Sequence, residues 1–226
     1  MGCRKLFILL WPLLVFLIST GCMKTSYTNI ENSNTSTTEL MNRQVSYWID
    51  PRFHQTFQRC VLVLIHSRDH EGDINNLIMR AFERYLGEIF ETVIGFRKAK
   101  TLSRTLAIDF YNQKDRKLLA KHAQCKFFAE IDIENIEDQF ALIWAKRSIK
   151  LTLKLAHAVT GKIVFKAKHT AQRSNGGLPL SAIGVPISIT QAAMVRGDAE
   201  TFHSLADDAA RRMTAPLPRL TAQQYF

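Results

Sequence analysis

The sequence predicts an α/β fold, in which helices pack on a mixed sheet that has a parallel portion and an antiparallel edge hairpin. Three patterns lead to this prediction. Residues 60–66 form a continuous apolar run with the length and β-branched content of a strand buried on both faces. Apolar residues then recur at three- and four-residue spacing over 74–90, as in an amphipathic helix. Residues 149–155 and 163–167 alternate apolar with polar side chains across a Thr160-Gly161 turn, which is typical of a hairpin.

The other elements follow from shorter patterns. In chain order we expect an irregular lead-in over 45–57, a short strand over 92–96, a helix over 115–124, a half-exposed strand over 126–133 and a closing helix over 199–213. The lead-in contains four aromatic residues around an Asp50-Pro51 turn signal. The half-exposed strand alternates at period two, and the closing helix ends before Pro216. Strands alternating with helices and then pairing with each other predict one mixed α/β domain.

The amino-terminal segment has the three regions of a secretory signal peptide. Arg4 and Lys5 precede an apolar run that is too short to span a bilayer, and small residues 19–21 follow directly before Cys22. We therefore expect a signal peptide over 1–21, a flexible Thr-, Ser- and Asn-rich tether over 22–44, an α/β domain over 45–218 and a tail over 219–226. A cysteine after small residues resembles the lipobox of bacterial lipoproteins, which implies that Cys22 is lipidated. The alternative is an ordinary cleavage site with a chance cysteine.

The chain is basic, with 30 Lys and Arg against 20 Asp and Glu. Removing residues 1–21 takes away two basic residues and no acidic ones, so 28 against 20 remain, or about +8. Such a surface favours anionic headgroups, anionic glycans or an acidic protein partner. Nucleic acid is not an expected partner, because the signal peptide predicts export. We expect no cofactor, since the sequence contains no phosphate-binding glycine-rich loop.

Cys60 and Cys125 are the two cysteines left after the signal peptide and Cys22 are set aside. Each directly precedes a predicted strand, so on neighbouring parallel strands the two thiols would lie at the same end of the sheet. An oxidising compartment permits a disulfide between them. We favour two buried free thiols instead, because adjacent positions on parallel strands often miss disulfide geometry.

A polar loop follows the first strand and contains His66 and His70 with Asp69 and Asp73. Ligands of open α/β sheets bind at this end of the strands, and these side chains are zinc-ligand types. The spacing is not that of a known zinc motif, so we favour a polar loop whose acidic residues support the following helix. A metal-dependent enzyme using His66 and His70 is the alternative hypothesis.

Basic residues of the predicted hairpin are expected to share one solvent-facing surface. This predicted basic face comprises Lys146, Arg147, Lys150, Lys154, Lys166 and Lys168, extended by His169 and Arg173. Like charges opposite one another on a sheet destabilise it, so their clustering predicts an anionic partner. The alternative is a solvated face at a sheet edge that lysines protect from aggregation.

Residues 178–195 are mildly apolar and rich in small side chains. They are predicted either to form an interface with a partner or a second copy of the chain, or to cover the domain's own core.

The element order, with three local features, resembles the fold group of the curli-secretion lipoprotein and of the lipoprotein activators of penicillin-binding proteins. The features are the lone apolar strand 60–66 after a tether, the strand-turn-strand 149–165 with its Thr160-Gly161-Lys162 turn, and Gly176-Gly177 followed by a small-residue stretch and a closing helix. The resemblance implies a periplasmic, non-enzymatic partner in envelope assembly, secretion or transport, or an activator of a cell-wall synthase. Met23, where an inner-membrane retention signal would have Asp, implies the outer membrane.

Replacing the proposed acceptor tests the lipid anchor. We expect Cys22→Ser to abolish acylation, because no thiol then remains at the processing site. Metabolic labelling with a fatty acid measures this, and retained label on the variant would contradict the assignment of Cys22.

Overall fold

The computed structural model of the protein describes residues 25–30, 44–55, 59–67, 72–109, 112–141, 144–176 and 200–220. Its strands are β1 (Ser26–Asn29), β2 (Gln44–Ile49), β3 (Cys60–Ser67), β4 (Thr92–Ile94), β5 (Phe127–Ala141), β6 (Trp144–His157) and β7 (Ile163–Gly176). Its helices are α2 (Asp73–Leu86), α3 (Phe96–Thr105), α4 (Gln113–Ala123) and α6 (Glu200–Thr214), with the 3-10 helix η3 (Pro51–Gln55). No helix in this described part is long and apolar enough to cross a membrane.

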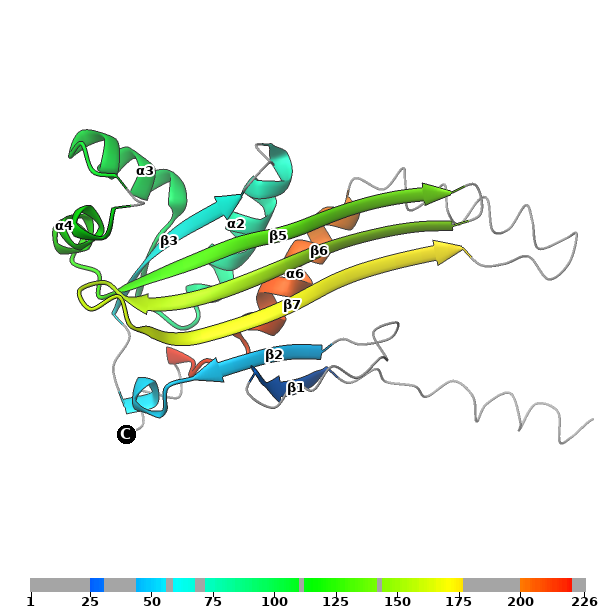
Figure 1. Cartoon of the computed structure of the whole chain (residues 1–226), viewed down its shortest axis with the longest axis horizontal. Helices are drawn as coiled ribbons and strands as arrows, with labels where there is room; N and C mark the ends of the chain where they lie inside the picture. The colour runs from blue at the N-terminus through cyan, green and yellow to red at the C-terminus, as the bar shows by residue number, and fades with distance from the viewer. Residues whose placement is uncertain are drawn as a thin grey trace, which may run out of the picture.

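The described strands form one seven-stranded mixed sheet in the order β1-β2-β7-β6-β5-β3-β4 (Figure 1). β3 pairs in parallel with β4 and β5, and β1 pairs in parallel with β2, whereas the three remaining pairs are antiparallel. The predicted fold class is therefore confirmed. The hairpin β6–β7 lies inside the sheet instead of at its edge, because β2 and β1 extend the sheet beyond β7.

Two stretches that the sequence assigned to irregular chain are strands. Residues 44–49, from the last residue of the predicted tether into the predicted lead-in, form β2, which pairs with β7 from Val45 opposite His169 to Ile49 opposite Phe165. Its alternation is hidden in the sequence because Trp48 places a large apolar residue on the polar side. Residues 26–29, in the predicted tether, form β1 against β2.

The alternation of side chains along β5, β6 and β7 separates an apolar face from a polar one. On the first face, α2 and α6 pack against buried residues such as Ile131, Leu153 and Ala167, which are opposite one another on the three strands. We call this the helix face. Fully burying a Leu or Ile side chain is worth about 1.5–3 kcal/mol, so this layer supplies much of the driving force for folding.

The part of the chain that the structure describes covers the other face at one end, where α3 and α4 lie (Figure 1). There Leu62, Leu64 and Phe128 of the sheet pack against Ala99 of α3 and Leu119 of α4. Beyond Leu64 and Phe128 the same face carries charged and polar side chains. We call that uncovered part, over β5, β6 and β7, the open face.

The core assignment predicts how truncation at the centre of the sheet acts. We expect Leu153→Ala to lower the free energy of unfolding by about 2–5 kcal/mol, because the fully buried side chain leaves a cavity between β6 and α6. Leu118→Ala is the control, since Leu118 is 51% exposed on α4, and it should change stability by less than about 0.5 kcal/mol. Chemical denaturation measures both, and equal losses would contradict the assignment.

Candidate functional site

The open face is built from two rows of side chains that the strand register places opposite one another. In the first row, Glu130 of β5 is opposite Lys154 of β6, which is opposite Lys166 of β7. In the second row, His66 of β3, Asp132 of β5, Thr152 of β6 and Lys168 of β7 follow one another across the sheet. Opposite residues in a sheet lie about 4.5–5.5 Å apart at Cβ, so these side chains form one continuous surface.

A β-bulge adds Glu134 to this surface. The register of β5 against β6 shifts between Ile133 and Asn135, so Glu134 is an extra residue on β5. Its carboxylate accepts a 2.6 Å hydrogen bond from the Thr152 hydroxyl, and the Nζ atoms of Lys150 and Lys168 each lie 3.4 Å from a carboxylate oxygen. The bulge therefore centres an acidic group between two lysines.

These contacts change how Glu134 titrates. The Thr152 hydrogen bond, and then the ammonium groups of Lys168 and Lys150, lower the pKa of Glu134 below its ordinary value of 4.5, although partial burial acts in the opposite direction. Because the pKa is lowered on folding, Glu134 stabilises the folded chain above pH 4.5, and this stabilisation is lost as the pH falls through the lowered pKa.

Carboxylates pair with most of the lysines of the predicted basic face. The Lys154 Nζ atom lies 2.6 Å from Asp132 Oδ2, and the Lys146 Nζ atom lies 3.1 Å from Glu137 Oε2. Glu130 forms an ion pair with Arg116 of α4, and its Oε2 atom lies 3.7 Å from His66 Nε2. The open face is therefore a surface of mixed charge. Its described strand residues include five lysines (Lys146, Lys150, Lys154, Lys166 and Lys168) and four carboxylates (Glu130, Asp132, Glu134 and Glu137), and Arg116 adds a cation from α4.

Lys166 differs from the other lysines of this surface. In the part of the chain that the structure describes, no carboxylate lies within ion-pair distance of it. It is opposite Lys154 on one side and Trp48 of β2 on the other. Lys154 is turned toward Asp132 on the neighbouring strand, which relieves the repulsion between the two ammonium groups.

The open face is hollowed by a cavity of about 740 Å³. It is lined by His66, Ser67, Asp132, Ile133, Glu134, Thr152, Lys154, Lys166 and Lys168. The volume is in the range of cavities that bind small ligands or a protruding side chain of a partner. The lining offers cations, carboxylates and a hydroxyl, which suit a polar or charged ligand.

Arg147 and His169 were predicted for the basic face but lie on the helix face instead. Arg173 lies on the helix face as well, because it is opposite Arg147 and two residues after the buried Ala171 on β7. Arg147 is 7% exposed, with its guanidinium 4.9 Å from the centre of the Phe202 ring of α6 and its Nε atom 3.1 Å from Asp138 Oδ1. His169 is also buried, and this burial lowers its pKa. The correction follows from the period of a strand, because Arg147 alternates with Lys146 and His169 with Lys168. These lysines do not lie on an edge of the described sheet either, since β1 and β4 are its edge strands.

The predicted sites outside the hairpin have different outcomes. A disulfide joins Cys60 and Cys125, with their Cα atoms 4.7 Å apart, at the shared end of parallel strands β3 and β5. The structure thus has the state that the sequence analysis favoured less. His66 lies on the open face, whereas His70 lies outside the described residues, within which no three His, Cys, Asp or Glu side chains cluster as metal ligands would. Cys22 and residues 178–195 also lie outside the described part.

The acidic members of the open face were not predicted from the sequence. Glu130 and Asp132 are the polar positions of the alternating strand 126–133, so the alternation does contain a signal for them. Glu134 carries no such signal, because only the bulge directs it to the open face. Arg116 reaches the surface from α4, which long-range packing positions.

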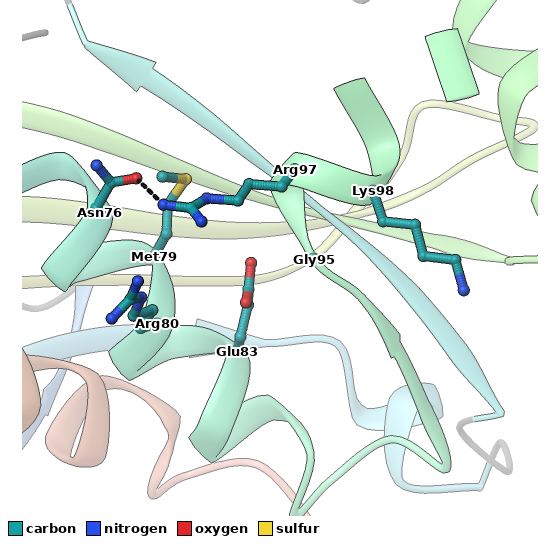
Figure 2. Close-up of a pocket in the computed structure, with 7 residues that line it drawn as sticks. All are labelled: Asn76, Met79, Arg80, Glu83, Gly95, Arg97 and Lys98. Atoms are coloured by element: carbon teal, nitrogen blue, oxygen red, sulfur yellow. Dashed lines mark hydrogen bonds between the residues drawn. The ribbon is translucent and has the colours of Figure 1, made fainter. Parts of the chain in front are cut away.

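A second cavity of about 350 Å³ lies between α2 and α3 (Figure 2). Figure 2 shows that Glu83 of α2 points toward Gly95, and its Oε1 atom accepts a 3.0 Å hydrogen bond from the Phe96 backbone N–H. A Cβ atom on Gly95 would collide with this carboxylate. Glu83 thus caps the amino-terminal end of α3, where a negative charge is favourable. This carboxylate supports the fold, and we do not assign a ligand to the cavity.

The hydrogen bond between Thr152 and Glu134 gives a test of the network. We expect Thr152→Val to raise the pKa of Glu134 toward 4.5 and to lower stability at neutral pH by about 1 kcal/mol. The variant should lose less stability than the wild type on acidification below pH 4.5, since the lowered pKa is the source of that loss. Carboxyl-carbon NMR titration measures the pKa, with Thr170→Val, at an exposed position of β7, as the control. An unchanged pKa in Thr152→Val would contradict the network.

No protein-family model matches the chain, and no curated protein does. Among solved structures, the chain is similar to the PelC dodecamer from Paraburkholderia phytofirmans, with 14% identity and a TM-score of 0.44, covering 76% of this chain and 96% of that one. It is similar to the C-terminal domain of LpoB from Salmonella enterica, with 12% identity and a TM-score of 0.39, covering 52% of this chain and 85% of that one. For lipoprotein GNA1162 from Neisseria meningitidis the identity is 12% and the TM-score 0.39, covering 63% of this chain and 99% of that one.

These structures include a lipoprotein, and bacterial lipoproteins are the broad group that the sequence resembles. The finer resemblance to curli-secretion or activator lipoproteins stays a prediction. Similarity at this level of identity and TM-score carries no inference about activity or partners, so the proposed function is based on the residues of this chain.

Proposed function

We propose that this chain is a lipid-anchored, non-catalytic binding protein at the periplasmic side of the bacterial outer membrane. It acts as an accessory subunit of an envelope assembly, secretion or transport complex. The address is supported by the signal peptide pattern over 1–21 and by Cys22 after small residues. The mode of action is supported by the open face.

The observation that carries the proposal is the uncovered area of the central strands. Among the described residues, helices cover this face of the sheet only where α3 and α4 pack, and the rest of it is a hollowed surface of mixed charge. Exposed ion pairs of this kind contribute only about 0–1 kcal/mol each to stability, so the fold itself gains little from them. Their arrangement is better suited to selecting a partner of complementary charge.

The partner's complementary group is acidic. Cations outnumber carboxylates on the open face, and Lys166 and Lys154 are opposite one another with Asp132 engaging only Lys154. Because Lys166 has no carboxylate within ion-pair distance among the described residues, a carboxylate of the partner would give it a charge-assisted hydrogen bond and would also lie near Lys154. We therefore expect a protein partner that inserts an acidic side chain into the cavity of the open face.

Site-specific crosslinking tests this function in the lipidated, full-length chain. A photoreactive amino acid at position 166 should form an adduct with an envelope protein, and mass spectrometry of the adduct identifies it. The matched control is position 117, an exposed lysine on α4 that does not line the cavity. Lys166→Glu should also reduce the amount of partner that co-purifies, whereas Lys117→Glu should not.

Two results would contradict the proposal. One is crosslinking that is equal at positions 166 and 117, and the other is recovery of the partner that is unaffected by Lys166→Glu. If the test succeeds, the identity of the captured protein shows which complex the chain joins. Capture of a cell-wall synthase would support a role as an activator of that enzyme.

A further inference from the structure

The described amino-terminal segment is attached to the folded domain, although its composition is that of a tether. β1 pairs in parallel with β2 from Ser26 opposite Gln44 to Asn29 opposite Tyr47. The Gln44 side-chain amide donates a 2.8 Å hydrogen bond to the Thr28 hydroxyl, and the Tyr27 and Tyr47 rings meet edge to face with centroids 6.1 Å apart. Backbone and side-chain contacts together hold this segment at the edge of the sheet.

A buried arginine fixes the start of this segment. Arg212 of α6 is 4% exposed, its Nη1 atom donates a 2.7 Å hydrogen bond to the Thr25 hydroxyl, and its Nε atom lies 2.7 Å from Asp208 Oδ2. A buried guanidinium is costly unless it is paired and hydrogen-bonded, so contacts to Thr25 and Asp208 are favoured over solvent. Thr25 is therefore tied directly to the helix layer.

The length of chain before Thr25 sets the distance to the anchor. Cys22 is three residues away, and three residues span at most about 10 Å in any conformation. If the whole of 22–44 were a free tether, its root-mean-square length would be roughly 25 Å and its full extension about 75 Å. The contacts of β1 thus remove most of the freedom that the composition implies.

We propose that β1 docks the anchor on the domain, so that the sheet edge formed by β1 and β2 lies against the lipid surface and residues 31–43 are not part of the tether. This inference depends on the lipid at Cys22 that the proposed function assigns. The domain is then held in one orientation. The helices α3 and α4, which pack near β3 and so toward the edge of the sheet opposite β1 (Figure 1), are directed away from the membrane.

Energy transfer to acceptor lipids in liposomes tests the orientation. A donor dye is placed at Thr170→Cys or at Lys121→Cys of the lipidated full chain. Thr170 is exposed on β7, next to His169, which is opposite Val45 near the start of β2. Because β7 and β1 are two strand spacings apart, position 170 lies about 10 Å from β1. Lys121 is exposed on α4. We expect strong transfer from position 170 and a loss of most of that transfer from position 121.

A matched pair of insertions separates a docked anchor from a free tether. About twenty Gly and Ser residues between Met23 and Lys24 lengthen the path from lipid to β1, and should remove the difference between the two dye positions. The same insertion between Thr35 and Ser36 lengthens only the connection from β1 to β2, and should preserve the difference. Equal effects of the two insertions, or equal transfer from both positions in the parent chain, would overturn the proposal.

Failure of the anchor itself is recognised separately. Mass spectrometry of the mature chain is performed first, and an unmodified Cys22 would contradict the proposed function. A lipidated chain that transfers energy equally from both positions would overturn only the docking by β1.

Discussion

The strict alternation of side chains along three long central strands is the constraint on which the rest of the structure depends. β5, β6 and β7 place every second residue on the helix face, where α2 and α6 bury it, and the residues between them on the opposite face. One register therefore determines both the core and the charged surface. A slip by one residue would exchange them, which the burial of Ile131, Leu153 and Ala167 makes very unfavourable.

The two faces are completed differently. At one end α3 and α4 cover the second face, and the disulfide between Cys60 and Cys125 joins β3 to the start of β5 beneath them. Beyond that end the polar residues are left to balance one another, and the bulge at Glu134 supplies the acidic group that two lysines need. The result is a hollowed surface whose charges are mostly paired yet still positive in sum, as expected for a surface that selects an acidic partner.

In the proposed docking, the edge strand β1 relates this surface to the membrane. Arg212 holds Thr25 against the helix layer, so the described amino-terminal segment and the sheet edge are one structural unit. A domain that docks in a fixed orientation presents its open face in a defined direction, and this lowers the entropic cost of joining an assembly at the membrane. The proposed anchor and the proposed binding surface thus reinforce each other through the same sheet.

The sequence by itself determined the fold class, the order of the main strands and helices along the chain, and the five lysines that share the open face, because those features depend on local periodicity. It also indicated the anchor and its address through the pattern around Cys22, which stay predictions. Only the tertiary structure decided that Arg147 and His169 are buried on the helix face, that residues 26–29 and 44–49 join the sheet, and that Glu134 lies between two lysines. These outcomes depend on cross-strand register, a bulge and helix packing, which are contacts between residues far apart in the chain and leave no local pattern.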